Sequence, residues 1–156
     1  MNKIEVTAYD FPLPSWSGAI SCYALKVLDE MQFNNWELSV LLCGDKTITG
    51  LNRQYRGKEE ATDVLSFSLD AEIKDKTGLR YLPGDVIISL ETLRENSLYF
   101  QTPAEEEFRR LLIHGILHLS GMDHKTIDKD EPMLVLQEEI LKKIKNDPII
   151  PDGGLF

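Results

Sequence analysis

All three histidines of this chain lie within eleven residues, in the segment HGILHLSGMDH that begins at His114. His114 and His118 are four residues apart, so on a helix their rings project from one face, one turn from each other. Gly121 follows at a position where a left-handed residue ends a helix, and the chain reversal would return His124 toward the other two rings. The spacing H-x3-H-x2-G-x2-H therefore predicts a helix, a tight reversal and three imidazoles at one point.

The histidines are surrounded by apolar residues, namely Leu111, Leu112, Ile113, Ile116, Leu117 and Leu119. Such a helix is mostly buried, and an unsatisfied buried polar group costs about 1–3 kcal/mol. One shared metal ion would satisfy the imidazoles, and ordinary hydrogen bonds inside the core are the alternative. A closed structural zinc site normally has a fourth ligand such as Cys, but Cys22 and Cys43 are both distant in sequence. Three neutral nitrogens with an open position describe a catalytic centre better, where bound water ionises near pH ~7.

The residue after His114 narrows the chemistry. Zinc peptidases with this spacing have Glu directly after the first histidine as the general base, whereas this chain has Gly115. Peptide hydrolysis by that mechanism is therefore not expected.

Length, composition and charge indicate what kind of protein this chain forms. The chain has 156 residues, 42% of them hydrophobic, which suffices for one domain with a core of its own. A net charge of −9 argues against a protein that coats nucleic acid, but it allows a local grip on phosphate. No apolar run reaches the roughly 20 residues of a membrane helix, the start lacks a secretory signal, and only two cysteines are present. We expect a cytoplasmic protein without membrane contact, with a domain over residues 1–147 and a flexible tail over 148–156.

Periodicity indicates both strands and helices. Alternating apolar residues predict strands over residues 3–8, 36–42, 63–69 and 85–89. Helical spacing predicts helices over residues 17–33, 45–57, 91–101, 103–120 and 131–146. The polar stretch 70–84 is predicted to be a mobile surface loop.

Two local features carry more specific predictions. We expect Thr102 to cap the histidine-bearing helix, Pro103 to occupy its first position and Glu105 to complete a capping box. Cys22 and Cys43 stand in apolar patterns, which predicts that both are buried.

The histidine segment resembles the signature of the YbeY family, bacterial metal-dependent endoribonucleases that act in ribosomal RNA maturation. Two further blocks agree in family order: NRQYRGK over residues 52–58 followed by TDVLSF over 62–67, and GDVII over 84–88. The resemblance covers about residues 50–140. Ser68 departs from it, because the family usually has proline there, and this affects local strand geometry rather than the histidines.

The resemblance implies an α+β single domain, with a roughly four-stranded mixed sheet packed against about five helices and a central histidine-bearing helix. It implies one zinc ion per chain, although nickel or another divalent metal also suits imidazole ligands. It implies a single-strand-specific endoribonuclease acting at the 3′ end of 16S ribosomal RNA and in ribosome quality control. Its partners would be single-stranded RNA, ribosomal RNA, the small ribosomal subunit and assembly factors.

Arg56 is the best candidate for a substrate contact. A guanidinium offers a planar fork that grips a phosphate in two places and stabilises developing charge. Arg53 and Lys58 flank it and extend a small basic patch for substrate binding. We assign catalysis to Arg56 and His114, and metal binding to His114, His118 and His124. An ordinary exposed surface arginine is the alternative for Arg56.

Two aspartates are candidates for supporting roles. Asp123 either orients a ligand imidazole or caps the turn after Gly121. Asp85 opens a predicted strand and, by resemblance, lines the site; an ordinary turn aspartate is the alternative. Two other functions fit parts of the pattern, a non-catalytic ribosome-assembly factor with a structural metal and a peptidase-like metal hydrolase.

Overall fold

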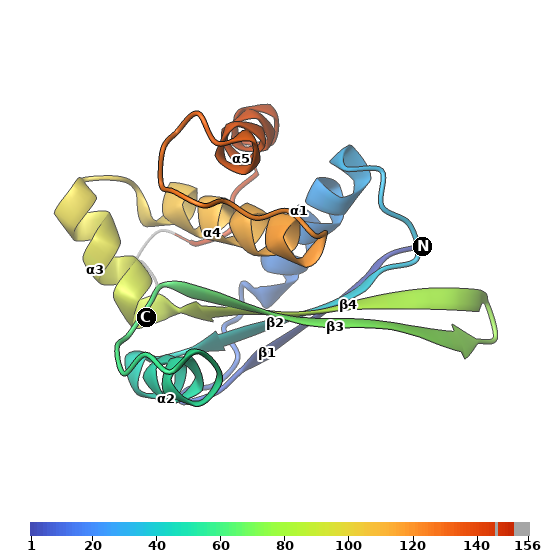
Figure 1. Cartoon of the computed structure of the whole chain (residues 1–156), viewed down its shortest axis with the longest axis horizontal. Helices are drawn as coiled ribbons and strands as arrows, with labels where there is room; N and C mark the ends of the chain where they lie inside the picture. The colour runs from blue at the N-terminus through green and yellow to red at the C-terminus, as the bar shows by residue number, and fades with distance from the viewer. Residues whose placement is uncertain (146, 152–156) are drawn as a thin grey trace.

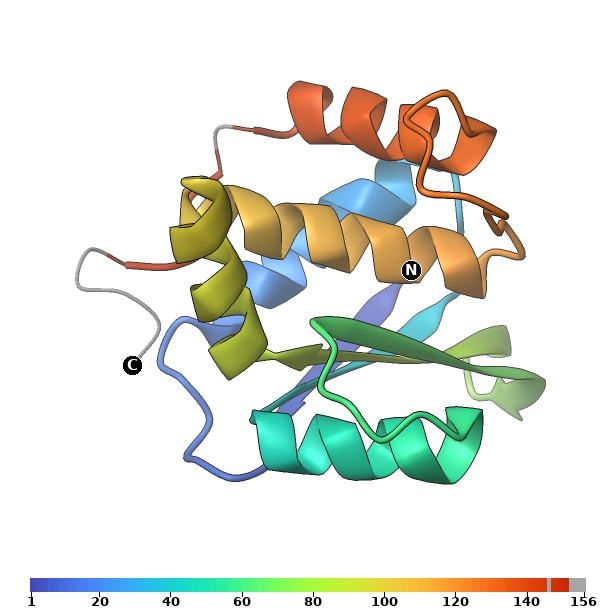
Figure 2. The same ribbon diagram turned by 60° about the vertical axis from the view of Figure 1, so that its left-hand side comes forward.

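The computed structural model describes residues 1–145 and 147–151. These residues form a four-stranded sheet and five helices, in the order β1 (Lys3–Ala8), α1 (Ser17–Glu30), β2 (Glu37–Cys43), α2 (Asp45–Arg56), β3 (Val64–Asp75), β4 (Gly78–Ser89), α3 (Leu90–Phe100), α4 (Ala104–Leu119) and α5 (Pro132–Lys143). In Figures 1 and 2, α2 lies on one side of the sheet and α4 lies on the other, between the sheet and α5. The expected α+β architecture with a central histidine-bearing helix is confirmed.

The sheet is mixed, with the strand order β1-β2-β4-β3. β1 pairs in parallel with β2, and β2 pairs in parallel with β4, whereas β3 pairs antiparallel with β4. Because side chains alternate along a strand, each face of the sheet meets a different layer. Val86 meets α4, and its neighbour Ile87 packs with the smaller apolar cluster that includes Ile48 of α2. The main core fills the space between the sheet and α1, α3, α4 and α5.

The stretch 70–84 is not a loop, so that prediction was wrong. It forms the outer parts of β3 and β4, which extend as a hairpin beyond the rest of the sheet. The turn has Gly78 at φ +119, and the Asp75 carboxylate accepts hydrogen bonds from the backbone N–H and the hydroxyl of Thr77. Most residues near the turn are exposed, although Arg80 is only 3% exposed, and the polar residues there make the sequence resemble a loop. The strand predicted to open at Asp85 therefore begins at Gly78.

The start of α4 also differs from the prediction. Pro103 occupies the N-cap position rather than the first helical position, and no side chain caps the helix. The Thr102 hydroxyl donates to the Phe100 carbonyl. Glu105 forms an ion pair with Arg109 at 3.3 Å and accepts a hydrogen bond from the Ile149 backbone, so it does not complete a capping box.

The chain that follows α5 returns to the core. Ile149 is only 3% exposed and packs with the main apolar cluster, and the Arg109 guanidinium donates to the Asp147 carbonyl. The described residues 147–151 thus lie against the core, while the flexibility expected of the tail stays a prediction. Residues 152–156 of that prediction lie outside the described residues.

The two cysteines behave differently. Cys43 is buried as expected, in the cluster beneath α2. Cys22 is exposed on α1, so the prediction that it packs in the core was wrong. Among the described helices, none has the length and apolar character needed to cross a membrane.

Candidate metal centre

The helix α4 carries the first two histidines on a well-anchored scaffold. Its buried residues include Phe108, Leu112 and Ile116, which belong to the main core. His114 and His118 are only half-buried, one helical turn apart on the same helix. The packing therefore fixes the helix while it leaves both rings partly accessible.

The helix ends as the sequence predicted. The last helical residue is Leu119, and Gly121 adopts φ +103, which only glycine tolerates without strain. The N–H of Gly121 donates to the His118 carbonyl at 3.0 Å, and the N–H of Met122 donates to the Leu117 carbonyl at 3.1 Å. This turn reverses the chain and returns His124 toward the helix.

The three imidazoles meet at one point. One nitrogen from each ring lies within 4.8 Å of those of the other two. The ring centroids are 4.6 Å apart for His114 and His118, 5.3 Å for His114 and His124, and 5.5 Å for His118 and His124. No other group of three His, Cys, Asp or Glu side chains within residues 1–145 and 147–151 has this metal-binding geometry.

The donor set fits a divalent transition metal. The Nε2 atoms of His114 and His118 are 3.1 Å apart. Zinc–nitrogen bonds of about 2.0–2.1 Å in a tetrahedron place two ligand nitrogens about 3.3 Å apart, which is close to the observed separation. Imidazole nitrogens suit zinc, nickel and copper.

Hydrogen bonds to the outer ring nitrogens fix the protonation of two histidines. The Nδ1 atom of His124 lies 2.7 Å from the Thr126 carbonyl oxygen, which can only accept, so Nδ1 carries the proton. His114 Nδ1 lies 2.7 Å from the side-chain oxygen of Gln137 and is protonated for the same reason. In its neutral form, each of these two rings therefore carries its lone pair on Nε2.

Burial favours the neutral form of the two histidines on α4. Desolvation lowers the pKa of His114, the hydrogen bond that His114 donates to the Gln137 oxygen raises it, and the nearby His124 lowers it. Desolvation and the neighbouring His114 likewise lower the pKa of His118. Neutral imidazole is the form that binds metal, so these directions favour loading of the site.

Asp123 serves the turn more than the rings. Its carboxylate accepts a hydrogen bond of 2.8 Å from the backbone N–H of His124, which stabilises the return after Gly121. The same oxygen lies 3.8 Å from Nδ1 of His118, too far for a hydrogen bond. Of the two roles expected for Asp123, the structure contains the contact in the turn and lacks a hydrogen bond to an imidazole.

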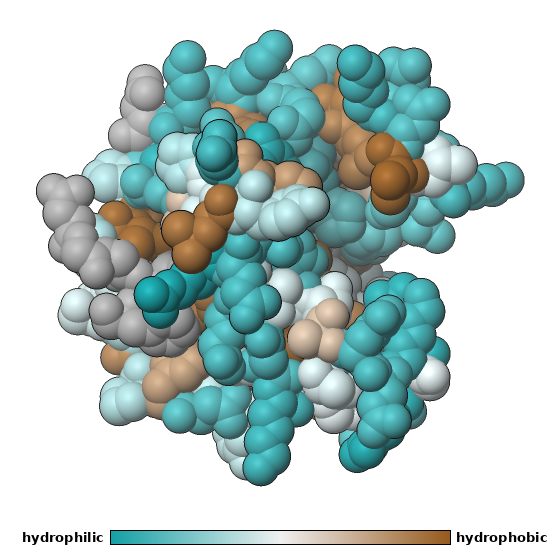
Figure 3. All heavy atoms as spheres, turned by 90° about the vertical axis from the view of Figure 1, so that its left-hand side faces the viewer, coloured by the Kyte–Doolittle hydropathy of each residue, from teal (hydrophilic) through white to brown (hydrophobic). Residues whose placement is uncertain are grey.

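The predicted substrate-side residues lie on the other helix layer. Arg56 is the last residue of α2, followed by Gly57 in a left-handed conformation at φ +70. Arg53, Arg56 and Lys58 are exposed, and the Arg53 guanidinium lies 3.2 Å from the Glu59 carboxylate. In Figure 2 the C-terminal ends of α2 and α4 point the same way, one below and one above the sheet. Figure 3 shows the surface hollowed at the height of the sheet between these two layers.

Asp85 does not join the histidines. It pairs with Phe67 across β3 and β4, and Phe67 contacts Tyr55 of α2 with ring centroids 4.9 Å apart. Asp85 lines a cavity of about 630 Å³ together with Leu51 and Tyr55 of α2. The expectation that Asp85 supports the metal centre therefore conflicts with its place on the sheet face opposite α4.

Sequence reasoning missed two polar residues near the histidines. Gln137 of α5 bonds to His114, and Asp63 lies close enough for its charge to raise the pKa of His114. Asn96 of α3 donates to the Asp63 carboxylate at 3.4 Å. Gln137 is the one polar residue in an apolar position of α5, and that break in the helical pattern was the available signal.

The fold and the site define an α+β protein with a three-histidine candidate metal centre on its central helix. Comparison with known proteins agrees with this class. The profile of the family described as Endoribonuclease YbeY matches residues 10–145, and the chain belongs to that family.

Individual relatives cover nearly the whole chain. Endoribonuclease YbeY of Treponema pallidum (strain Nichols) is 49% identical over 142 residues, 90% of this chain and 89% of that protein. Endoribonuclease YbeY of Treponema denticola is 41% identical over 147 residues, 93% of this chain and 95% of that protein. The solution structure of TM1509 from Thermotoga maritima covers 98% of this chain and 99% of its own, with 25% identity and a TM-score of 0.59.

Proposed function

We propose that this protein is a zinc-dependent endoribonuclease that cleaves single-stranded RNA during maturation of the small-subunit ribosomal RNA and in ribosome quality control. The observation that carries the proposal is the convergence of three histidine nitrogens within 4.8 Å at the end of a buried helix. Membership of the Endoribonuclease YbeY family supports the RNA substrate.

The residues around the centre divide the work. A divalent ion held by His114, His118 and His124 would supply hydroxide at neutral pH. Gln137 and Thr126 hold the rings in the tautomer that leaves Nε2 free, and the Gly121 turn delivers the third ring. The half-burial of His114 and His118 limits water around them while it leaves an open side for substrate.

Arg56 is proposed to bind the RNA phosphate. No described residue pairs with its guanidinium, so the fork is free to take two phosphate oxygens. Arg53 is held only by an exposed ion pair, which contributes little and is readily exchanged for a phosphate. Together with Lys58 these residues place three positive charges at and just beyond the C-terminal end of α2 in an otherwise acidic protein.

The proposal includes the setting of the reaction. We propose zinc as the metal, with nickel as the alternative that imidazole ligands also accept. The partners would be ribosomal RNA, the small ribosomal subunit and assembly factors, in the cytoplasm. A peptidase-like reaction lacks support because the position after His114 is Gly115, which is buried against the sheet.

The test measures metal content and cleavage of a single-stranded RNA on the same preparations. Arg56→Ala should keep the metal but lose at least about tenfold in cleavage rate, because the developing charge loses a bidentate donor. Arg56→Lys should recover only part of the rate, since a point charge does not reproduce the planar fork. His118→Ala should lose the metal first and activity with it.

Arg94→Ala is the matched control, because Arg94 is an exposed arginine on α3 and belongs to another surface. It should cleave RNA at the wild-type rate. Wild-type cleavage by Arg56→Ala would remove Arg56 from the substrate side. Absence of cleavage by the metal-loaded wild type would favour a non-catalytic assembly factor.

A further inference from the structure

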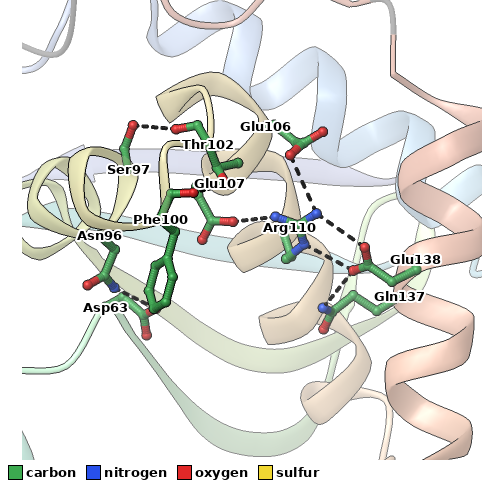
Figure 4. A network of polar contacts seen from close by, with 10 residues as sticks. All are labelled: Asp63, Asn96, Ser97, Phe100, Thr102, Glu106, Glu107, Arg110, Gln137 and Glu138. Atoms are coloured by element: carbon green, nitrogen blue, oxygen red, sulfur yellow. Dashed lines mark hydrogen bonds and ion pairs between the residues drawn. The ribbon is translucent and has the colours of Figure 1, made fainter. Parts of the chain in front are cut away.

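A chain of polar contacts leads from the metal centre along α4 toward the N-terminal end of that helix. The side chain of Gln137, 7% exposed on α5, lies between His114 and the carboxylate of Glu138. The Arg110 guanidinium grips Glu138 in two places, with Nε at 3.0 Å and Nη2 at 3.2 Å from the two carboxylate oxygens. Figure 4 shows Arg110 held in turn by Glu106 and Glu107 one helical turn earlier on α4.

This arrangement determines which way the Gln137 amide points. The Glu138 carboxylate only accepts hydrogen bonds, because Arg110 and Gln137 hold the pKa of Glu138 below its usual value despite its partial burial. The group 3.1 Å from it must therefore be the NH2 of Gln137. The Gln137 oxygen is then directed at His114, at 2.7 Å from Nδ1.

The orientation of the amide has a consequence for the imidazole. A ring nitrogen that faces an oxygen acceptor must carry the proton, so His114 is held as the Nδ1–H tautomer. Its Nε2 lone pair then points into the three-histidine cluster, where it lies 3.1 Å from Nε2 of His118. A flipped amide would present its NH2 to Nδ1 and would favour the tautomer that cannot bind metal through Nε2.

We propose that Gln137 is a positioning residue of the metal centre, and that the Glu138–Arg110 ion pair holds its amide in the orientation that prepares His114 for the metal. The inference rests on the metal centre proposed above. Metal-binding histidines commonly give their second N–H to a carboxylate or a backbone carbonyl. Here a neutral amide takes that place, and the carboxylate stands one residue further away.

Burial of the polar Gln137 side chain costs free energy, and its contact with His114 offers a reason for it. A buried glutamine must satisfy both ends of its side chain, whereas a leucine of similar size in an apolar helix pattern would need no partner. Gln137 satisfies one end on a metal-centre histidine and the other on a clamped carboxylate. It therefore connects the packing of α5 on α4 to the state of His114.

The experiment measures Co2+ affinity by competition with a chelator, together with the visible absorption of the bound Co2+. Gln137→Leu should weaken Co2+ binding about ten- to hundredfold and change the absorption band, as expected when a partner of a ligand histidine is lost. Gln137→Glu combined with Glu138→Gln keeps an acceptor for Nδ1–H without placing two carboxylates side by side, and should recover most of that loss. Glu138→Gln frees the amide to flip and should weaken binding by less than Gln137→Leu.

Glu139→Leu is the matched control, because Glu139 is exposed on the same helix and next to the clamp. It should bind Co2+ as the wild type does. The thermal midpoint of each metal-free variant separates a positioning role from a merely structural one, which would lower the midpoint and leave the affinity unchanged.

Three results would overturn the inference: wild-type affinity and absorption in Gln137→Leu, a folded variant with both Gln137→Glu and Glu138→Gln that binds as weakly as Gln137→Leu, or wild-type affinity in Glu138→Gln. The last of these keeps the test decisive if Gln137→Leu does not fold. Failure of the wild type to bind Co2+ would instead refute the proposed metal centre itself.

Discussion

Gly115 lies directly against Val86, so α4 rests on the sheet at the residue that follows the first histidine. A Cβ at Gly115 would lie 2.6 and 2.8 Å from the two γ-carbons of Val86 and 3.3 Å from the Ser66 hydroxyl. The backbone of α4 can approach β4 this closely only without a side chain. In zinc peptidases the residue at this position is the glutamate that acts as general base. Here Val86 of the sheet occupies the space that such a side chain would need.

The first prediction concerns this contact. Gly115→Ala should lower the free energy of unfolding by about 1–3 kcal/mol, because the added methyl group overpacks the junction of α4 and β4. Urea denaturation measures the loss. Val86→Ala in the same chain should restore part of the stability, since it removes the two γ-carbons that lie nearest to the added methyl group. A fully stable Gly115→Ala would show that α4 shifts at little cost.

The second prediction concerns the turn that delivers His124. Gly121→Val should weaken metal binding without removing a ligand, because a β-branched residue resists φ +103 and the chain would return less closely. Space is not the obstacle, since no atom lies within 4 Å of an added Cβ at Gly121. Chelator competition with Zn2+ measures the affinity.

Gly50→Ala serves as the control for the glycine turn. Gly50 lies within α2, with open space around an added Cβ and no left-handed conformation. Alanine there should raise stability by about 0.5–1 kcal/mol through helix propensity, with unchanged metal affinity. Wild-type affinity in a folded Gly121→Val would contradict the role of the turn.

Tyr23 provides a prediction about pH. Its hydroxyl is buried and has no hydrogen-bond partner among the described residues. Burial raises the pKa of Tyr23 to about 12, with the charge of Arg109 acting in the opposite direction. In the unfolded chain the phenol loses its proton near pH 10.0, so between these values the unfolded state binds fewer protons. Stability therefore falls as the pH rises through this window.

Tyr23→Phe removes both the unpaired hydroxyl and this titration. We expect it to raise the free energy of unfolding by about 1 kcal/mol at pH 7 and by more above pH 10, since the variant lacks the alkaline loss. Urea denaturation at several pH values gives the difference between the two proteins. A constant difference from pH 7 to 11 would mean that the Tyr23 pKa is not raised.

Local chemistry explains how much of the site could be predicted. Helical geometry places His114 and His118 on one face, and the left-handed turn at Gly121 returns His124 to them. The cluster therefore followed from the spacing alone. The side of the sheet on which a residue lies depends instead on register. Asp85 was expected near the histidines, but alternation along β4 turns it toward α2.

Contacts between segments that are distant in the chain could not be predicted from local sequence patterns. Gln137 reaches His114 only because α5 packs against α4, and no local sequence pattern reveals how two helices pack against each other. The hairpin of β3 and β4 was missed because most side chains near its turn are exposed, so the stretch lacks the apolar alternation of a half-buried strand. The buried Ile149 was missed because its position next to prolines resembles a loose end.

The last prediction concerns removal of the metal. The main core is built from residues of β2, β4, α1, α3, α4 and α5, and it includes none of the three histidines. The metal-free protein should therefore keep its helix and strand content, as measured by far-ultraviolet circular dichroism. Its stability should nevertheless fall, since a ligand at a hundred times its Kd stabilises the folded state by about 2.7 kcal/mol.

The loss of stability on metal removal should arise in the segment that carries His124. His124 lies in the segment 120–131 between α4 and α5, whose side-chain contacts include hydrogen bonds within the segment, such as that from Thr126 to Glu131. Amide hydrogen exchange should therefore speed up in this segment on chelation, while the central strand β2 keeps its protection. His118→Ala should show the same pattern with or without added Zn2+. Unfolding of the entire chain on chelation would instead make the metal structural, because the core would then depend on a centre that it does not contain.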